Sequence, residues 1–437
     1  MTRRLLAAAL LLAACGSPAP PVPPPEPATV PDSPPDRPPD SATVRPSDRP
    51  ADRPTDRSSG PLIRIALARS AADARVSGTA GLVVTDPSGA VVARAEAGTE
   101  VRLGRDGRLV AVRQGSRLLA RDERLAVAPA EGGALVVDGK RYRGSVDALA
   151  ENGGVTLVNA LALEAYLPSV VTAELGRRTG AEREAVLAQA IIARTYALRN
   201  QGRGRAAGYD LESGVGDQVY GGADAEDSLA TEAVRATAGV IVAWQGQPID
   251  AFFHSTCGGR TERGVDVFRG ADRPYLRSFA DVDGDGLAWC RLSPRFRWRE
   301  EWTGVELERV LRETLPAAGT RLPEGAGRLR DVRVTERTGS GRAAALAIRW
   351  EHADVSVSGQ DVRRVLRPPA GGWLRSAQVE FRTERGGRLE RLIAEGAGAG
   401  HGVGLCQWGA IGRARAGQRH DAILAAYYPG TTLIRFY

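Results

Sequence analysis

The stretch TGAEREAVLAQAIIARTYALRN, residues 179–200, carries the clearest folding signal in the chain. Thr179 and Glu182 have the spacing of a capping box, in which each side chain bonds the backbone N–H of the other residue. Leu187 and Ile191 then fall on one helix face, and the alanines around them allow close approach of a neighbouring helix. The stretch therefore predicts a helix packed tightly against other elements.

Short strands are expected on the N-terminal side of this helix. From about Leu62 to Asn159 the chain alternates apolar and polar residues between turn signals, and DPSGA at residues 86–90 predicts a hairpin. After the helix, residues 225–239 predict a second helix. VIVAWQGQPIDAFFHST then predicts two strands joined by a turn at Gln245–Gly246. Further helices are expected in GVELERVLRETL and GAIGRARAG, so the fold class is α+β, with mixed short-stranded sheets and a few helices.

Length and charge limit the classes of partner. A chain of 437 residues can form two or three domains with a buried core. Lys and Arg number 59 and Asp and Glu 52, which gives a formal charge of +7, with nearly all of the positive charge on Arg. A modest positive excess suits an anionic envelope polymer. No basic cluster interleaved with aromatic residues is present, so no nucleic-acid partner is expected.

The N-terminus predicts export. MTRR is followed by the apolar run at residues 5–14, which has signal-peptide length and is too short to span a bilayer. The run ends in LAAC, which resembles the bacterial lipobox, and this predicts that Cys15 is lipidated and anchors the protein to a membrane. The alternative is an ordinary signal peptide with an incidental cysteine. Gly16, in place of Asp, favours the outer membrane in a cell with two, facing the periplasm or exterior.

A tether is expected between the signal peptide and the folded part. Residues 16–60 hold more than half of the 27 prolines, and Asp-Arg-Pro recurs three times. This composition cannot build a core and predicts an extended, disordered linker. The expected organisation is a signal peptide at 1–15, a linker at 16–60 and a folded domain at 61–437.

Glycine dominates the stretch GHGVGLCQWGA, residues 400–410. Such density requires tight turns or close approach of the backbone to another group. The stretch lacks the Gly-Lys-Ser/Thr of a phosphate-binding loop. With four His in the chain and no HExxH or CxxC, no metal site is expected. Cys406 with His401 remains open as a nucleophile and base, and the other alternative is close approach to a large, hydroxyl-rich ligand.

Six segments in order resemble one protein family. They are LEAYLPSVVTAELG (163–176), EAVLAQAIIARTYAL (184–198), AFFHSTCGGRTE (251–262), PYLRS (274–278), GHGVGLCQWGA (400–410) and ILAAYYPGT (423–431). Together they are similar to the stage II sporulation protein D family, which includes peptidoglycan lytic transglycosylases and amidase enhancers. The resemblance runs from about Leu62 to the C-terminus. It implies a glycan-binding cleft and a division of the domain into a β-rich part (61–160), a catalytic core (161–280), an α+β insertion or subdomain (281–390) and a C-terminal part of the core (391–437).

The resemblance implies cleavage of peptidoglycan glycan strands between N-acetylmuramic acid and N-acetylglucosamine. In this reaction the 6-hydroxyl of the muramic acid closes on its own anomeric carbon, so one acid replaces the two carboxylates of most glycosidases. The matching acid is Glu174, set among the apolar residues of VVTAELG. A partly apolar pocket would raise its pKa for this role. The alternatives are a solvated Glu at a helix end or a Glu paired with Arg177 or Arg178.

Further family positions imply substrate contacts. Arg194 is expected to orient Glu174 or bind a sugar substituent, with an ordinary ion pair as the alternative, and Tyr220 to stack on a sugar ring. A core histidine is the alternative for His254. The full set of expected binding residues is Gln189, Arg194, Gln218, Tyr220, His254, Ser255, Thr256, His401 and Gln407. The glycines beside His401 are then interpreted as room for a sugar polymer. Neither a cofactor nor a zinc ion is expected, because residues 209–222 lack the Cys and His found in some relatives.

Two departures leave a second function open. Relatives often carry Lys where this chain has Leu187, and Pro where it has Gly176. The alternative is a binding protein that holds glycan and enhances a partner N-acetylmuramoyl-L-alanine amidase without cutting the strand. A cysteine hydrolase based on Cys406 and His401 is a third hypothesis. We expect a disulfide between Cys257 and Cys290, which bracket PYLRS, worth about 3 kcal/mol, with Cys406 as the unpaired thiol.

Overall fold

The structure is a computed structural model that describes residues 60–437 apart from 152 and 387. The described residues belong to one compact unit. It is 24% helical and 38% strand and contains several small sheets, in agreement with the expected α+β class. The predicted signal peptide, Cys15 and all but the last residue of the predicted tether lie outside the described residues. Within the described part, no helix is long and apolar enough to cross a membrane.

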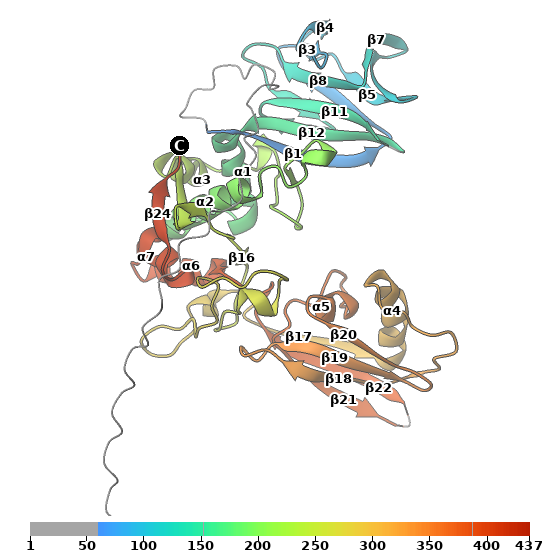
Figure 1. Ribbon diagram of the computed structural model, residues 1–437, viewed down its shortest axis with the longest axis vertical. Helices are drawn as coiled ribbons and strands as arrows, with labels where there is room; N and C mark the ends of the chain where they lie inside the picture. The colour runs from blue at the N-terminus through green and yellow to red at the C-terminus, as the bar shows by residue number, and fades with distance from the viewer. Residues whose placement is uncertain (1–59, 152, 387) are drawn as a thin grey trace, which may run out of the picture. The chain divides into compact units, whose positions relative to one another are not determined.

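Two sheets build the N-terminal part (Figure 1). The first has the order β13 (Leu211–Glu212), β1 (Leu62–Ala71), β12 (Gly154–Ala162), β11 (Ser145–Glu151), β8 (Arg124–Pro129), β3 (Leu82–Thr85) and β4 (Val91–Ala95). The second has the order β10 (Lys140–Tyr142), β9 (Leu135–Val137), β2 (Asp73–Gly78), β5 (Val101–Asp106), β6 (Leu109–Gln114) and β7 (Arg117–Asp122). The predicted hairpin at DPSGA is confirmed, because Asp86 accepts hydrogen bonds from the N–H groups of Ser88 (2.8 Å) and Ala90 (3.0 Å) between β3 and β4.

Strand β12 connects these sheets to the helices. Eight of its nine residues are buried, because it contacts β5 of the second sheet and also the helix that follows it. A strand covered on both faces reads as a continuous apolar run, as GVTLVNALA does. The chain passes directly from Ala162 into α1 (Leu163–Leu175), so the sheet fixes the start of the helix that carries Glu174.

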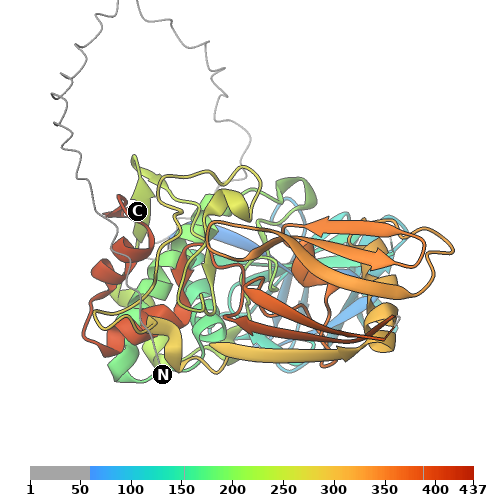
Figure 2. The ribbon, with the colours of Figure 1, turned by 90° about the horizontal axis from the view of Figure 1, so that it is seen from below.

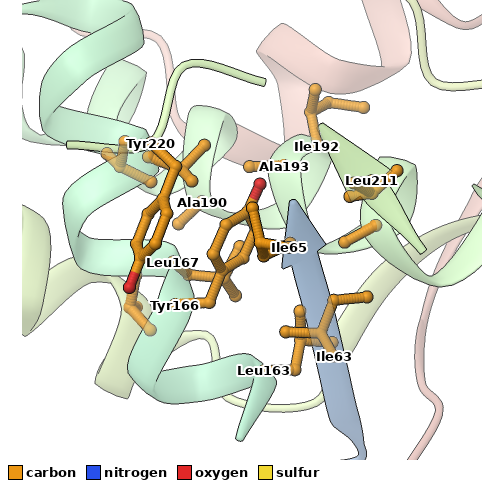
Figure 3. Close-up of a cluster of buried hydrophobic side chains, with 14 of the residues drawn as sticks. Ile63, Ile65, Leu163, Tyr166, Leu167, Ala190, Ile192, Ala193, Leu211 and Tyr220 are labelled. Atoms are coloured by element: carbon orange, nitrogen blue, oxygen red, sulfur yellow. The ribbon is translucent and has the colours of Figure 1, made fainter. Parts of the chain in front are cut away.

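Three helices form the centre of the unit. The predicted helix at 179–200 is confirmed as a 3₁₀ turn, η2 (Gly180–Glu182), followed by α2 (Arg183–Asn200). Its capping box is present, and α2 is packed by α1 and by α3 (Ser228–Ala236). Figure 3 shows the resulting cluster, in which Ala190 and Ala193 of α2 lie near Tyr166 of α1 and Ile65 of β1. The second predicted helix is shorter than expected because the Asp227 carboxylate caps α3, accepting from Leu229 N at 2.9 Å.

The C-terminal segment returns to this core. The predicted strands around Gln245–Gly246 are confirmed as β14 (Val240–Trp244) and β15 (Gln247–Pro248), and β24 (Thr432–Arg435) pairs with β14. The short strands β16 (Phe253–His254) and β23 (Leu405–Cys406) pair in parallel, with Phe253 opposite Leu405. This pairing joins two of the sequence motifs across about 150 residues of chain. Helices α6 (Gln407–Arg415) and α7 (His420–Tyr427) follow, and α6 packs on α2.

A second apolar core lies between residues 298 and 394. One of its sheets has the order β17 (Arg297–Thr303), β22 (Leu389–Ala397) and β21 (Val379–Arg385). The other has the order β18 (Leu329–Arg337), β19 (Ala343–Trp350) and β20 (Asp354–Ser358), and both are drawn in orange and red in Figure 2. Helix α4 (Gly304–Ala317), which the sequence predicted, begins with a capping box between Thr303 and Glu306. Helix α5 (Asp361–Val365) completes the region. The domain boundaries inferred from the sequence remain predictions.

Candidate functional site

Glu174 lies in the last turn of α1, where Gly176 with φ of 75° ends the helix. Its side chain is half-buried. One carboxylate oxygen accepts a hydrogen bond from the backbone N–H of Val219 at 2.8 Å. No ion pair within 4 Å includes Glu174 among the described residues. The carboxyl group is therefore held in place by a neutral donor and carries no compensating cation.

Burial raises the pKa of Glu174 above its ordinary value. The hydrogen bond from the N–H of Val219 opposes this rise, and the nearby side-chain amide of Gln407 also favours the charged form without reaching hydrogen-bond geometry. Gln407 opens α6, and its Nε2 atom has no hydrogen-bond partner within the described part of the chain. The net effect is a carboxyl group that keeps its proton to higher pH than a solvated glutamate, which suits a general acid.

The two arginines after Glu174 are engaged elsewhere. Arg177 pairs with Asp227 at 3.3 Å. The Arg178 side chain donates to the carbonyl of Leu175 at 2.7 Å and lies over the ring of Trp408, 5.0 Å from its centroid. The alternative in which Glu174 pairs with either arginine is therefore wrong, and the half-burial of its side chain argues against the alternative of a solvated Glu at a helix end.

Arg194 does not contact Glu174. It is fully buried and forms a two-pronged ion pair with Glu164 of α1, at 2.7 and 2.8 Å. Its remaining donors bond the carbonyls of Val234 and Val240, both at 3.1 Å. The prediction that Arg194 orients the acid or binds sugar is corrected, because all of its donor groups already tie α2 to α1 and to the end of α3.

Gln218 and Tyr220 also lie in the core, which corrects their predicted substrate contacts. Gln218 is fully buried and accepts from the hydroxyl of Tyr166 at 3.3 Å. Tyr220 is 6% exposed, donates to Asn159 at 2.8 Å, and packs its ring 4.9 Å from that of Tyr166. Figure 3 shows Tyr166 and Tyr220 among apolar side chains. Their burial positions the segment between them, whose Val219 N–H reaches Glu174.

Gln189 is buried in the middle of α2 with no exposed surface. Neither its Oε1 nor its Nε2 has a hydrogen-bond partner within the described residues. Full burial excludes the direct substrate contact that the sequence predicted. An unpaired buried amide is costly, typically by about 1 to 3 kcal/mol.

The two histidines lie together, away from hydrogen-bond contact with Glu174. His254 Nδ1 pairs with the carbonyl of Val403 at 3.1 Å, and His401 Nδ1 accepts from the N–H of the same residue at 3.0 Å. Their ring centroids are 5.4 Å apart. Burial lowers the pKa of His254 well below its ordinary value and that of His401 to about 3, so both imidazoles are neutral at physiological pH. The core alternative holds for His254, which is 4% exposed.

The predicted site residues thus divide into two groups. Gln407 lies with Glu174, and the neighbouring Trp408 donates its backbone N–H to the carbonyl of Ser255 at 3.0 Å. Thr256 is buried and bonds Ser293 at 2.8 Å. His401 instead borders a small hollow lined also by Arg342 and Arg363. A separate hollow of about 810 Å³ lies on the β17, β22 and β21 sheet.

The glycines of the 398–409 loop approach the protein's own backbone. A Cβ at Gly398 would lie 2.4 Å from the carbonyl oxygen of Thr256, and one at Gly404 would lie 2.0 Å from that of Phe252. At Gly409 it would lie 2.0 Å from the hydroxyl of Tyr427. The interpretation of these glycines as room for a sugar polymer is corrected, because they let the loop lie against the β16 segment and α7.

The expected disulfide is not formed. Cys257, Cys290 and Cys406 are all free and buried, and the Cys257 and Cys290 sulfurs are 3.5 Å apart, whereas a disulfide bond is about 2.05 Å long. The physical reason is that Cys406 joins the other two, so three thiols share one place. Cys406 is a free thiol, as expected, and its sulfur lies within 4.8 Å of the other two.

Two contributors to the Glu174 environment have no sequence signal of their own. The Val219 N–H is a backbone group, and Tyr166 lies eight residues before Glu174 within the apolar face of α1. The contribution of each group to the Glu174 environment can be recognised only when residues 217–221 are known to fold back over α1.

Comparisons with known proteins agree with this architecture. A family model described as "Stage II sporulation protein" matches residues 151–244, and a domain of unknown function, DUF8618, matches residues 290–404. Stage II sporulation protein D of Bacillus subtilis is 30% identical over 291 residues, which cover 63% of this chain and 75% of that protein. An uncharacterized protein of Brachyspira hyodysenteriae is 28% identical and covers 69% of this chain and 74% of its own length.

A third relative carries a different name. The amidase enhancer of Bacillus subtilis is 26% identical over 284 residues, covering 58% of this chain and 38% of that protein. These relatives place the chain among proteins with a cell-wall-related function. The chain belongs to the stage II sporulation protein D family.

Proposed function

We propose that this protein is a lytic transglycosylase that cleaves peptidoglycan glycan strands between N-acetylmuramic acid and N-acetylglucosamine, leaving 1,6-anhydro-muramic ends. The observation that carries the proposal is the Glu174 carboxyl group, half-buried, unpaired with any cation among the described residues and fixed by the Val219 N–H at 2.8 Å. Membership of the family supports the substrate class. A glycan-binding cleft beside Glu174 is part of this proposal.

In the proposed reaction Glu174 acts twice. Its protonated carboxyl donates a proton to the glycosidic oxygen as the bond to the anomeric carbon breaks. The resulting carboxylate then accepts the proton of the muramic 6-hydroxyl as that oxygen closes on the anomeric carbon. No water enters the product, so a second carboxylate is not needed. The raised pKa of Glu174 favours the first step, and the Val219 N–H stabilises the carboxylate formed by it.

Gln407 is proposed to contact the substrate beside the acid. It lies next to the Glu174 carboxyl, and its Nε2 is a buried donor without a partner in the described part of the chain. Such a donor is available for a sugar hydroxyl or N-acetyl oxygen. Ser255, half-buried on the adjoining segment, and His401 are proposed to extend the contact surface.

The amidase-enhancer function is the second candidate, because one relative bears that name. A specific observation favours it: Leu187, where relatives often carry Lys, is 3% exposed and part of the core. The α2 surface therefore presents no cation at this position. In this alternative the site holds glycan and a cell-wall amidase supplies the chemistry.

The rate of glycan release from purified cell walls separates the two functions. Removing a general acid typically costs about 10²- to 10⁴-fold in rate, so we expect Glu174→Gln to lower release by at least about 100-fold. Glu232→Gln is the matched control, because Glu232 is exposed and paired only with Arg183. Equal release by wild type and Glu174→Gln would contradict the enzyme. Release that appears only after a purified amidase is added would instead support the enhancer.

A further inference from the structure

Three cysteine side chains from distant parts of the chain converge at one buried point. Cys257 follows β16, Cys290 lies in the 3₁₀ helix η6 (Trp289–Leu292), and Cys406 ends β23. Their sulfur atoms all lie within 4.8 Å of one another, and each residue is fully buried. A tetrahedral zinc ion with Zn–S bonds of about 2.3 Å requires sulfurs about 3.8 Å apart. The Cys257–Cys290 separation of 3.5 Å is close to that spacing.

Backbone N–H groups point at two of these sulfurs. Cys406 Sγ accepts from Cys257 N at 3.1 Å and from Gly409 N at 3.2 Å, and Cys257 Sγ accepts from Gly259 N at 3.4 Å. A neutral thiol is a weak acceptor. Several N–H donors aimed at buried sulfur therefore suit thiolates, the form in which cysteine binds metal.

A buried carboxylate adjoins the cluster. Asp281 has no exposed surface, and its Oδ2 lies 3.3 Å from Cys257 Sγ. Tyr427 donates to Oδ2 at 2.8 Å, and Arg413 donates to Oδ1 at 2.9 Å, so the carboxylate is oriented from the far side. A Cβ at Gly409 would lie 2.5 Å from Oδ2, so this approach depends on glycine. Asp281 contacts Cys257, but it is not among the ligand atoms that all lie within 4.8 Å of one another.

The surrounding charges fit a divalent cation. Three thiolates and one carboxylate around a 2+ ion leave two negative charges. Arg413 pairs with Asp281, and Arg342, which is 3% exposed, donates to the carbonyl of Cys257 at 2.8 Å. The two guanidinium groups offset those charges. Without a cation the same four acidic groups would not all ionise in a buried setting.

We propose that Cys257, Cys290 and Cys406 bind a structural zinc ion through three thiolates, and that metal binding draws the adjoining Asp281 carboxylate into the fourth position. Thiolates select soft or borderline ions such as Zn²⁺ over Mg²⁺ or Ca²⁺, and binding releases one proton from each thiol. The ion would clamp the 398–409 loop to the β16 segment and η6. Because Gln407 directly follows Cys406, the clamp also fixes the residue that lies beside Glu174. This site departs from the sequence-based expectation that the chain binds no metal.

The test is the metal and thiol content of the full-length protein, purified in detergent without a polyhistidine tag or chelator. We expect about one zinc ion per chain by elemental mass spectrometry, as a four-ligand site requires. Cys257→Ser, Cys290→Ser and Cys406→Ser should each lose most of it. Cys15→Ser is the matched control and should keep it, since Cys15 is not one of the proposed ligands. Cobalt substitution of the wild type should give a sulfur-to-cobalt charge-transfer band, whether or not the cysteine variants fold.

A disulfide is the competing state of the same residues. A disulfide would give metal-free wild-type protein whose intact mass is lower by two hydrogens. This mass difference would disappear in Cys257→Ser and in Cys290→Ser, and it would remain in Cys406→Ser. That result would overturn the proposal, as would zinc that stays bound in all three cysteine variants. Metal content is measured without any glycan assay, so the outcome is independent of the proposed transglycosylase activity.

Discussion

Burial of the charged Glu174 carboxylate lowers the stability of the folded protein, as the raised pKa of this group indicates. Its pKa is raised in the folded protein, so the folded state binds its proton more tightly than the unfolded chain does. The charged form therefore destabilises the fold once the pH exceeds the folded pKa, and it carries no penalty below the ordinary carboxyl value of 4.5. Removing the charge should therefore increase the free energy of unfolding only at pH values at which the folded protein would otherwise carry the charged carboxylate.

We accordingly expect Glu174→Gln to be more stable than wild type at neutral pH. The amide keeps the acceptor for Val219 N–H and has no charge to desolvate. The gain should shrink as the pH falls through the raised pKa and vanish below the ordinary one. Urea unfolding at several pH values measures it. A gain that is independent of pH, or a loss at neutral pH, would show that burial does not control this carboxyl.

Gln189 offers a second test on a single residue. Replacing its unpartnered amide by an apolar chain of the same length removes an unsatisfied donor and acceptor. Gln189→Met should raise the free energy of unfolding by about 1 kcal/mol or more, and glycan binding should be unchanged because the residue is fully buried. A destabilised variant would mean that ordered water forms hydrogen bonds to the Gln189 amide. Weaker glycan binding would mean that Gln189 contributes to the substrate-binding site after all.

At the scale of elements, the packing of α1, α2 and α3 depends on one buried ion pair. Arg194 of α2 bonds Glu164 of α1 through two parallel hydrogen bonds, and both side chains are nearly inaccessible. Removing one partner of a buried pair leaves the other charge uncompensated, typically at a cost of about 3 to 5 kcal/mol.

Glu164→Gln should therefore lower the free energy of unfolding by about 3 kcal/mol or more. Glu232→Gln breaks the exposed pair with Arg183 and should cost no more than about 1 kcal/mol. Chemical denaturation of both variants provides the comparison. Similar small losses in the two would show that the Arg194 pair does not hold the helices together, and would return Arg194 to its predicted place beside the substrate.

The same elements show what could be predicted from the sequence. Capping residues, turn residues and apolar periodicity are local, so the helix at 179–200, the DPSGA hairpin, the Gln245–Gly246 turn and the helix of GVELERVLRETL were all predictable. The parallel pairing of β16 with β23 was not, because its partners lie about 150 residues apart. No local pattern encodes that register.

The site residues also divide into features that the local sequence predicts and features that depend on long-range contacts. The motif around Glu174 identified the carboxyl, but not the Val219 N–H that folds back over it. Arg194, Gln218 and Tyr220 match family positions that imply substrate contact, whereas all three are buried and bond other side chains of the core. The three cysteines were counted as one pair and a remainder, since convergence of three thiols depends on long-range folding.

At the scale of the whole molecule, the predicted attachment to a membrane depends on Cys15. The LAAC sequence predicts that this residue carries the lipid anchor. Cys15→Ser should therefore move the protein from the membrane fraction to the soluble fraction, which cell fractionation with immunodetection measures. Persistence of the variant in the membrane fraction would mean that another feature holds it there.

The central claim is that this family member cuts glycan itself, with Glu174 as its acid. Mass spectrometry of glycan fragments from purified peptidoglycan, both intact and stripped of stem peptides, tests it most directly. We predict 1,6-anhydro-muramic ends with the wild-type protein and none above background with Glu174→Gln. Absence of these ends from both, while the protein still sediments with the glycan, would contradict the claim and leave the amidase-enhancer function.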